Sequence, residues 1–281
     1  RAKAAEFSFL LGLITLTAQD EIGGTVVAGE TIDTAGSIEF ALGSSVDVTA
    51  GSSGGAGDVA LSGLGSLTLT DVDTANGAIT VTSAGVLTVT DVATGNNNNI
   101  SLTTTSGAIT AVATLNAGTG TVALTSVGAI SDDGDASTLI TADVLTGSAA
   151  GAITVDTTVA SATLTTSTAG AIDVDETDAI TLTSLANNGS ITVDAGGKIT
   201  ATSVVSGTNS DANDVSLNGT EIAVTRVDAL ADGDVTLTSG TGSITDTSAG
   251  LTGITADALK ATSADAITVD TSVASVELTA V

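Results

Sequence analysis

Short runs in which an aliphatic residue alternates with a polar one recur along most of the chain. Ile, Leu or Val takes every second position and Thr often fills the positions between, which is the period of a strand with one buried face. Five clear examples are Ser66–Val72, Ala78–Ser83, Val86–Val92, Ala179–Ser184 and Asp234–Ser239. The pattern predicts many short strands, and no comparable stretch has the spacing of an amphipathic helix.

The runs belong to a repeat at two scales. Leu67–Thr74 (LTLTDVDT) recurs as Leu87–Thr94 (LTVTDVAT), a shift of 20 residues. At the larger scale, Ile140–Thr166 aligns without gaps to Ile254–Ala280, 114 residues later, and 17 of the 27 positions are identical. With one inserted residue, the match covers residues 120–166 and 233–280. We infer that the chain grew by duplication of blocks that each hold several short units.

The short unit has the size of one coil of a β-solenoid. A coil of about 20–25 residues cannot bury its own apolar face, so stacked coils supply the core. Residues 24–281 are therefore expected to form a parallel β-solenoid of about 11 coils. The positions expected to point inward as aliphatic ladders are Ile79/Val81, Leu87/Val89, Ile153/Val155 and Ile180/Leu182. Tandem immunoglobulin-like β-sandwiches are the alternative, although such domains usually carry a core aromatic residue and Pro-bearing loops.

The composition fits a narrow, stacked core. The 281 residues include no Cys, Pro, Met, Trp, Tyr or His and only three Phe. Pro is excluded from interior strands, which donate hydrogen bonds to a neighbour. Without Cys or His, thiolate and imidazole catalysis, haem, iron–sulfur and ordinary zinc sites are excluded. Five cations against 32 acidic residues give a net charge of −27, which makes nucleic acid a poor partner.

Residues 1–23 form a separate, apolar N-terminal segment. Its apolar run, Phe7–Ala18, has 12 residues, fewer than the roughly 20 that span a bilayer. A signal-peptide core, a cap over the end of the β-domain and a broken membrane segment all remain open. The stretch KAAEFSFLLGLITLTA resembles a transmembrane segment of undecaprenyl-diphosphatases, but that family's other motifs have no counterpart downstream. We expect no phosphatase activity, and membrane contact only through this segment.

The repeats themselves resemble those of bacterial surface proteins. Gly77–Gly95 (GAITVTSAGVLTVTDVATG) and Ala195–Ser203 (AGGKITATS) are similar to the stem repeats of filamentous-haemagglutinin-type adhesins and of giant low-complexity surface proteins. The likeness covers most of residues 24–281. It implies a right-handed parallel β-helix in a secreted protein, located outside the cell or on its surface. The partners it implies are cell-surface glycans or other surface proteins.

The densest acidic cluster is a candidate metal site. Asp132, Asp133 and Asp135 place three carboxylates in four residues, and oxygen ligands of this kind suit Ca²⁺. The spacing does not match an EF-hand, and a solvated turn is the alternative. The stretch Asn209–Asp214 has the same two interpretations. Ca²⁺ is the one cofactor that the sequence suggests.

Other polar residues recur with the strands. Because stacked like charges repel, we expect most of the Asp residues that follow strands to occupy coil corners or alternate coils. These are Asp71, Asp91, Asp156, Asp173, Asp194 and Asp270. Outward Thr pairs could form a regular grid of the ice-binding kind, or serve as soluble strand formers. The pairs are Thr68/Thr70, Thr80/Thr82, Thr88/Thr90, Thr181/Thr183 and Thr236/Thr238.

The sequence favours a structural role over catalysis. Beyond residue 18 the only cations are Lys198, Arg226 and Lys260, and the only aromatic residue is Phe40. Polysaccharide-cleaving sites combine paired carboxylates with cations and aromatic platforms, so an enzyme of that class is the least favoured hypothesis. The expected function is a non-catalytic stalk or spacer of a surface-displayed, adhesin-like protein. A carbohydrate- or Ca²⁺-binding surface module is the alternative.

Overall fold

The computed structural model describes the backbone of five strands before residue 53 and, apart from residue 64, the whole chain from residue 57 onward. Side chains are described from residue 57, except at residues 64 and 111. Within these residues the chain is nearly all strand, with a 3₁₀ turn at Gly95–Asn97. No helix in this described part is long and apolar enough to cross a membrane. Residues 1–14 lie outside the described residues, so the interpretations of that segment stay predictions.

The chain divides into two compact units, residues 1–143 and 144–281. The strands of unit 1 are β1 (Thr15–Ala18), β2 (Ile22–Val26), β3 (Glu30–Thr34), β4 (Ile38–Leu42), β5 (Val46–Ser52), β6 (Val59–Gly63), β7 (Leu67–Thr74), β8 (Ile79–Ser83), β9 (Leu87–Val89), β10 (Asp91–Thr94), β11 (Ile100–Thr104), β12 (Ile109–Val112), β13 (Thr114–Asn116), β14 (Thr121–Ser126) and β15 (Ile130–Asp132). Strand β16 (Ile140–Ala149) spans the division.

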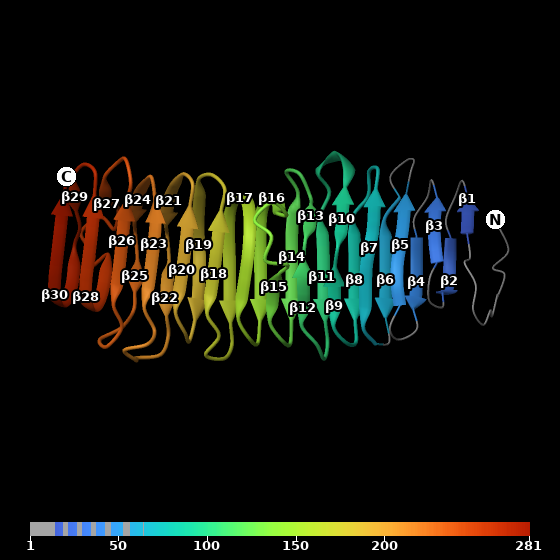
Figure 1. Cartoon of the computed structure of the whole chain (residues 1–281), viewed down its shortest axis with the longest axis horizontal. Helices are drawn as coiled ribbons and strands as arrows, with labels where there is room; N and C mark the ends of the chain where they lie inside the picture. The colour runs from blue at the N-terminus through green and yellow to red at the C-terminus, as the bar shows by residue number, and fades with distance from the viewer. Residues whose placement is uncertain are drawn as a thin grey trace. The chain divides into compact units, whose positions relative to one another are not determined.

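Unit 2 continues with strands of the same kind. They are β17 (Ile153–Thr166), β18 (Ile172–Glu176), β19 (Ile180–Asn187), β20 (Ile191–Ala195), β21 (Lys198–Ala201), β22 (Val204–Ser206), β23 (Val215–Gly219), β24 (Glu221–Val224), β25 (Val227–Asp228), β26 (Val235–Ser239), β27 (Ile244–Asp246), β28 (Ile254–Ser263), β29 (Ile267–Thr268) and β30 (Thr271–Ala280). In Figure 1 they run from yellow-green to red.

The strands of unit 1 stack in three parallel ladders. Ladder A joins β1, β3, the second half of β5, the second half of β7, β10 and β13. Ladder B joins β2, β4, β6, β8, β11 and β14. Ladder C joins the first halves of β5 and β7 with β9, β12 and β15. Each coil therefore has three faces, and each face bonds to the same face of the next coil.

Unit 2 repeats this plan. Ladder D joins the start of β17 with β18, β20, β23, β26, the end of β28 and the end of β30. Ladder E joins β17, β19, β21, β24, β27 and β29. Ladder F joins the end of β17, the end of β19, β22, β25, the start of β28 and the start of β30.

The parallel ladders confirm the predicted β-solenoid, to which the two units contribute about 11 turns. Immunoglobulin-like sandwiches are built from antiparallel sheets, so that alternative is wrong. Ladder D passes through Ile153, Ile172, Ile191, Val215, Val235, Leu259 and Val276, so one coil takes between 17 and 24 residues. Three of these six intervals have the 20–25 residues expected from the repeats, and the other three are slightly shorter.

The core is made of stacked aliphatic side chains. All eight positions predicted to point inward, from Ile79 to Leu182, are at most 2% exposed. Each lies directly above a similar residue, as Ile79 does between Val59 and Ile100. Burying such a side chain contributes about 1.5–3 kcal/mol. The core is thus a continuous aliphatic column within each unit.

Glycines at the corners permit close stacking of the backbone. Among the described glycines, Gly118, Gly134 and Gly250 have positive φ. At Gly77 the reason is different, because an added Cβ would lie 2.0 Å from the carbonyl oxygen of Gly57 in the coil below. At such a position only a residue without a side chain lets two coils approach to strand spacing.

The long sequence repeat does not coincide with whole coils. Ile153 lies on ladder D opposite Ile172, whereas its counterpart Ile267 lies on ladder E opposite Ile244. Leu164 lies on ladder F, and its counterpart Leu278 lies on ladder D. Equivalent residues of the two copies therefore lie on different faces.

Candidate functional site

Acidic side chains at the corners join one coil to the next. In unit 1, Asp58 Oδ1 accepts a hydrogen bond from the backbone N–H of Ala78 at 2.8 Å. In unit 2, Asp214 Oδ1 accepts from the N–H of Asp234, and Asp234 Oδ1 accepts from the N–H of Ala258, both at 3.0 Å. Each acceptor directly precedes a strand. Because hydrogen bonds to a charged acceptor are strong, these Asp residues act as ties between coils.

Buried Ser hydroxyl groups form hydrogen bonds at the corners that follow the strands, since Ser126, Ser239 and Ser263 are the last residues of β14, β26 and β28. Ser126 Oγ donates to the carbonyl of Gly107 in the preceding coil or of Ala129 in its own corner, at 3.1 and 3.0 Å. In unit 2, Ser239 Oγ likewise donates to the carbonyl of Thr220 in the preceding coil or of Gly242 in its own corner, at 2.9 and 2.7 Å. Ser263 continues this column and donates to the Gly242 carbonyl at 2.6 Å. These residues are at most 5% exposed, so the hydroxyls satisfy carbonyl groups that water cannot reach.

Three carboxylates stack directly on ladder D, because Asp175, which we did not single out, lies between Asp156 and Asp194. Asp156, Asp175 and Asp194 are register partners in three successive coils. Asn218 follows in the next coil and donates to Asp194 Oδ1 at 2.7 Å. At the strand spacing of about 4.8 Å, two unit charges in water repel by about 1 kcal/mol. The buried aliphatic residues on the same strands outweigh that cost.

A second acidic group lies on ladder A. Asp71 and Asp73 are on β7, and Asp91 begins β10 in the next coil, where Val92 stacks on Val72. Burial, together with the charges of Asp71 and Asp91, raises the pKa of Asp73 to about 6. Burial and the charge of Asp71 also raise the pKa of Asp91. Asp73 and Asp91 therefore bind a proton more readily than ordinary Asp residues.

Glu176 is a buried carboxyl group that we did not predict. It is 4% exposed and is the last residue of β18, where it follows Ile172 and Val174 on the buried face of the strand. Burial raises its pKa to about 7, against the opposing effect of hydrogen bonds from Thr157, Asp178 and Val159. The signal was present in the sequence, because Glu176 continues the inward alternation Ile-x-Val-x-Glu.

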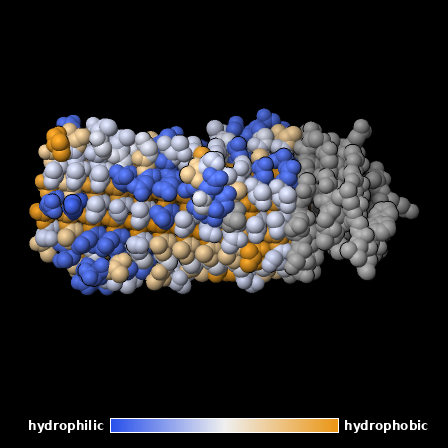
Figure 2. Space-filling model, viewed as in Figure 1, coloured by the Kyte–Doolittle hydropathy of each residue, from blue (hydrophilic) through white to orange (hydrophobic). Residues whose placement is uncertain are grey.

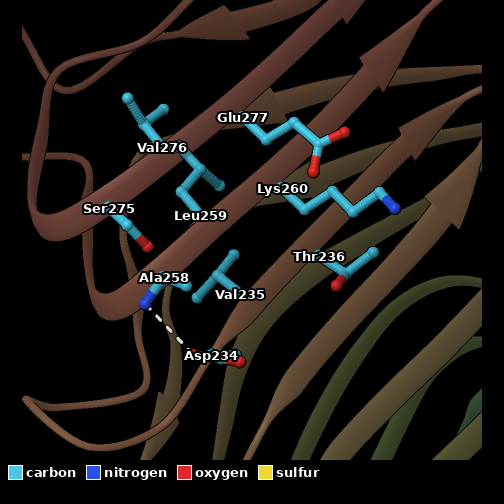
Figure 3. Close-up of a pocket in the computed structure, with 9 residues that line it drawn as sticks. All are labelled: Asp234, Val235, Thr236, Ala258, Leu259, Lys260, Ser275, Val276 and Glu277. Carbon is cyan, nitrogen blue, oxygen red and sulfur yellow. Dashed lines mark hydrogen bonds between the residues drawn. The ribbon is translucent and has the colours of Figure 1, made fainter.

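The cations of the described residues have different surroundings. Lys198 pairs with Glu221 at 2.7 Å, and Arg226 pairs with Asp228 at 2.8 Å. Lys260 lies on ladder D between Thr236 and Glu277. It lines a shallow surface hollow of about 400 Å³ formed by three successive coils (Figure 3). The hollow contains one cation between acidic and hydroxyl groups, with the side chain of Val276 beside them.

Of the candidate calcium ligands, Asp132 ends β15, and Asp133 and Asp135 lie in the exposed turn between β15 and β16. Asp132 Oδ1 accepts from the N–H of Gly134, and Asp133 Oδ1 accepts from the N–H of Asp135. Asp135 Oδ1 accepts two hydrogen bonds from Ser137, which lower the pKa of Asp135. Each of the three carboxylates thus accepts a hydrogen bond from a residue of the same turn. Among the described residues no group of three or more acidic side chains is arranged to hold a metal ion, and the calcium site stays a prediction.

The second acidic stretch also forms a corner. Asn209 Oδ1 accepts from the N–H groups of Ala231 and Asp232 in the next coil, at 2.7 and 2.9 Å. Its Nδ2 donates to Asp232 Oδ2 at 2.6 Å. With Asp214 at the other end, this stretch is a polar contact between two coils.

The outward Thr pairs do not share one surface. Thr68 stacks on Thr88 along ladder C, whereas Thr80 stacks on Ser101 along ladder B. In unit 2, Thr181 is on ladder E, and Thr236 on ladder D lies between Ser216 and Lys260. The pairs are therefore distributed over several faces and interrupted by other residues.

The visible surface mixes polar and apolar residues. Figure 2 shows hydrophilic side chains in separate patches between bands of intermediate and apolar colour. Exposed apolar residues are concentrated in the last coil, where Val276, Leu278 and Val281 are 58%, 50% and 90% exposed. Their equivalents deeper in ladder D, such as Leu237, are fully buried.

Comparisons with protein-family models, with curated proteins and with solved structures find no match to this chain.

Proposed function

We propose that this chain is a non-catalytic structural spacer, part of the stalk of a secreted, surface-displayed, adhesin-like protein. The observation that carries the proposal is the unbroken stacking in unit 2, where ladder D continues through seven strands. Each coil adds strand hydrogen bonds and aliphatic contacts only to its neighbours. Such a quasi-one-dimensional arrangement gains length by adding coils without changing its cross-section.

The corner contacts support the same role. The carboxylate of Asp234 bonds to the next coil while its own N–H is held by Asp214 of the preceding coil. Consecutive coils are thereby fixed at their corners as well as along their strands. A spacer needs this resistance to bending, since its task is to hold another module at a set distance.

The acidic surface and the repeat resemblance support the location. A net charge of −27 keeps a β-rich surface soluble and limits self-association. The stem repeats that Gly77–Gly95 resembles belong to proteins displayed outside bacterial cells. The proposed partners, cell-surface glycans or other surface proteins, would contact the module that the spacer carries.

The proposal is tested by measuring distances between spin labels along one ladder. Thr154 and Glu277 occupy the same outward line of ladder D, six coil intervals apart. At about 4.8 Å per coil, labels on Thr154→Cys and Glu277→Cys should be about 29 Å apart, with a narrow distribution. The chain has no Cys, so the labels are specific. The matched pair Thr192→Cys and Glu277→Cys spans four intervals and should give about 19 Å.

Broad distributions, or a distance that does not scale with the number of coils, would show that the unit is not a stiff spacer. Thermal melting with millimolar Ca²⁺ or soluble glycans separates the spacer from a binding module. A ligand that binds only the folded chain must raise the melting temperature by linkage. We expect no shift, and a rise with Ca²⁺ would favour the binding function instead.

A further inference from the structure

Glu176 occupies a column in which the other described side chains are neutral and small. Its partner in the preceding coil is Thr157 and its partner in the next coil is Ala195. Further along the same face, Ser239 and Ser263 fill the column. A carboxyl group has thus been placed where the fold elsewhere uses a hydroxyl or a methyl group.

The Glu176 carboxyl connects two coils. Oε2 accepts hydrogen bonds from Thr157 Oγ1 at 2.8 Å and from the backbone N–H of Val159 at 3.0 Å, both in the preceding coil. Oε1 accepts from the N–H of Asp178 in its own corner at 3.2 Å. The N–H of Val159 is buried and depends on this side chain for its partner. The contact is therefore a joint between the coil of β17 and the coil of β18.

The surroundings of this joint favour a neutral carboxyl group. The side chain of Asp178 forms a hydrogen bond with Glu176, and this bond raises the pKa of Glu176. The strands packed on β18 carry Asp156 on β17 and Asp194 on β20, and β18 itself carries Asp173 and Asp175. These groups are all acidic.

Lys198, the cation on the neighbouring β21, is paired with another carboxylate and does not stabilise the ionised form of Glu176. Gly197 N–H bonds to the Asp178 carbonyl, and the next residue, Lys198, is held by Glu221 at 2.7 Å. Burial is the largest cause of the raised pKa of Glu176, which is about 7 compared with 4.5 for an ordinary Glu. The three hydrogen bonds that Glu176 accepts lower its pKa and only partly offset burial.

We propose that the Glu176 corner is a protonation-dependent joint, closed when the carboxyl group is neutral and loosened when it ionises. The direction follows from linkage, because the folded state holds the proton more tightly than the unfolded chain does. The stability from this group is fully present below the unfolded pKa, near 4.5, and is lost as pH rises through about 7. A surface protein with such a joint would be stiffest in mildly acidic surroundings and would open locally, between β17 and β18, in neutral or alkaline ones.

The test compares native-state hydrogen exchange of the intact chain and of Glu176→Gln, which keeps the shape and removes the charge. We expect the opening equilibrium at the Val159 and Thr177 amides of the intact chain to increase on the order of 10- to 100-fold between about pH 5 and pH 8. In Glu176→Gln the increase should be absent. The control Asp257→Asn removes an exposed carboxylate of the same unit and should keep the increase.

A direct titration makes the result independent of variant folding. The Cδ resonance of Glu176 in the intact chain should titrate near pH 7. A midpoint near 4.5, or equal pH profiles for the intact chain and Glu176→Gln, would overturn the proposal. An equal loss of pH dependence in Asp257→Asn would also overturn it, since general charge repulsion would then explain the effect.

Discussion

Leu217 is the position at which the stacked core can be tested most directly. Its side chain is fully buried on ladder D, between Val193 in the preceding coil and Leu237 in the next. Leu278 lies on the same ladder in the last coil, where it is 50% exposed. The two Leu→Ala substitutions remove the same atoms from an enclosed and from an open position.

The expected costs differ because only one substitution leaves an enclosed cavity. Leu217→Ala loses the full transfer free energy and creates a void between two coils, so it should reduce stability by about 2–5 kcal/mol. Leu278→Ala loses about half the transfer free energy of a buried Leu, about 1 kcal/mol, and leaves no closed void. We therefore expect a difference of about 1–4 kcal/mol between the variants.

Native-state hydrogen exchange is the suitable assay, since solenoids need not unfold in one step. In Leu217→Ala the amides of β20, β23 and β26 should lose protection by roughly 30-fold or more, and distant coils should change less. In Leu278→Ala the loss should be confined to the last coil and be several-fold. Equal effects of the two substitutions, or a uniform loss over the whole chain, would refute the nearest-neighbour account of stability.

Three further outcomes are expected from urea or thermal unfolding. Gly77→Ala should cost about 1–3 kcal/mol or more, because its Cβ would lie 2.0 Å from a backbone oxygen, whereas Gly240→Ala meets its nearest atom at 3.8 Å and should change stability by less than about 0.5 kcal/mol. Asp234→Ala leaves the N–H of Ala258 without its acceptor and should lower the free energy of unfolding by about 1 kcal/mol. A change near zero would show that this hydrogen bond does not stabilise the stacking of the two coils. Asp73→Asn should flatten the stability profile between about pH 4 and pH 6, because the raised pKa of Asp73 favours its neutral form in the folded state. Since Asp73 is partly exposed, the gain at about pH 7 should be about 1 kcal/mol or less, and unchanged profiles would contradict the prediction.

The strands and the core were predictable because both depend on local alternation. The run at Ala78–Ser83 became β8, Ile79–Ser83, and its Ile79 and Val81 are fully buried. The run at Val86–Val92 was read as one strand, but the chain bends at Thr90 and continues as β10 on another ladder. Alternation shows which residues face inward, but it does not show where a coil turns its corner.

The contacts at the corners were less predictable because they depend on which residue stacks on which. The Asp residues at positions 58 and 234 resemble ordinary turn residues in the sequence, and only the coil offset brings them to the next N–H. The stacking of Asp156 on Asp175 was not expected, but water screens these charges enough to make it tolerable. Glu176 could have been found, since its inward position follows from the alternation that placed Val174 in the core.

The two copies of the long repeat place equivalent residues on different faces, which explains why the sequence period could not assign residues to faces. The counterparts Ile153 and Ile267 lie on ladders D and E, although the residues around them are nearly identical. This placement is stable because each face imposes the same requirements, aliphatic residues inside, small polar residues outside and a residue that fits the corner. A duplicated block can therefore enter the stack at any of three faces, provided that its inward alternation is kept. Duplication thus lengthens such a chain without needing to contain a whole number of coils, which suits a protein whose proposed task is to set a distance.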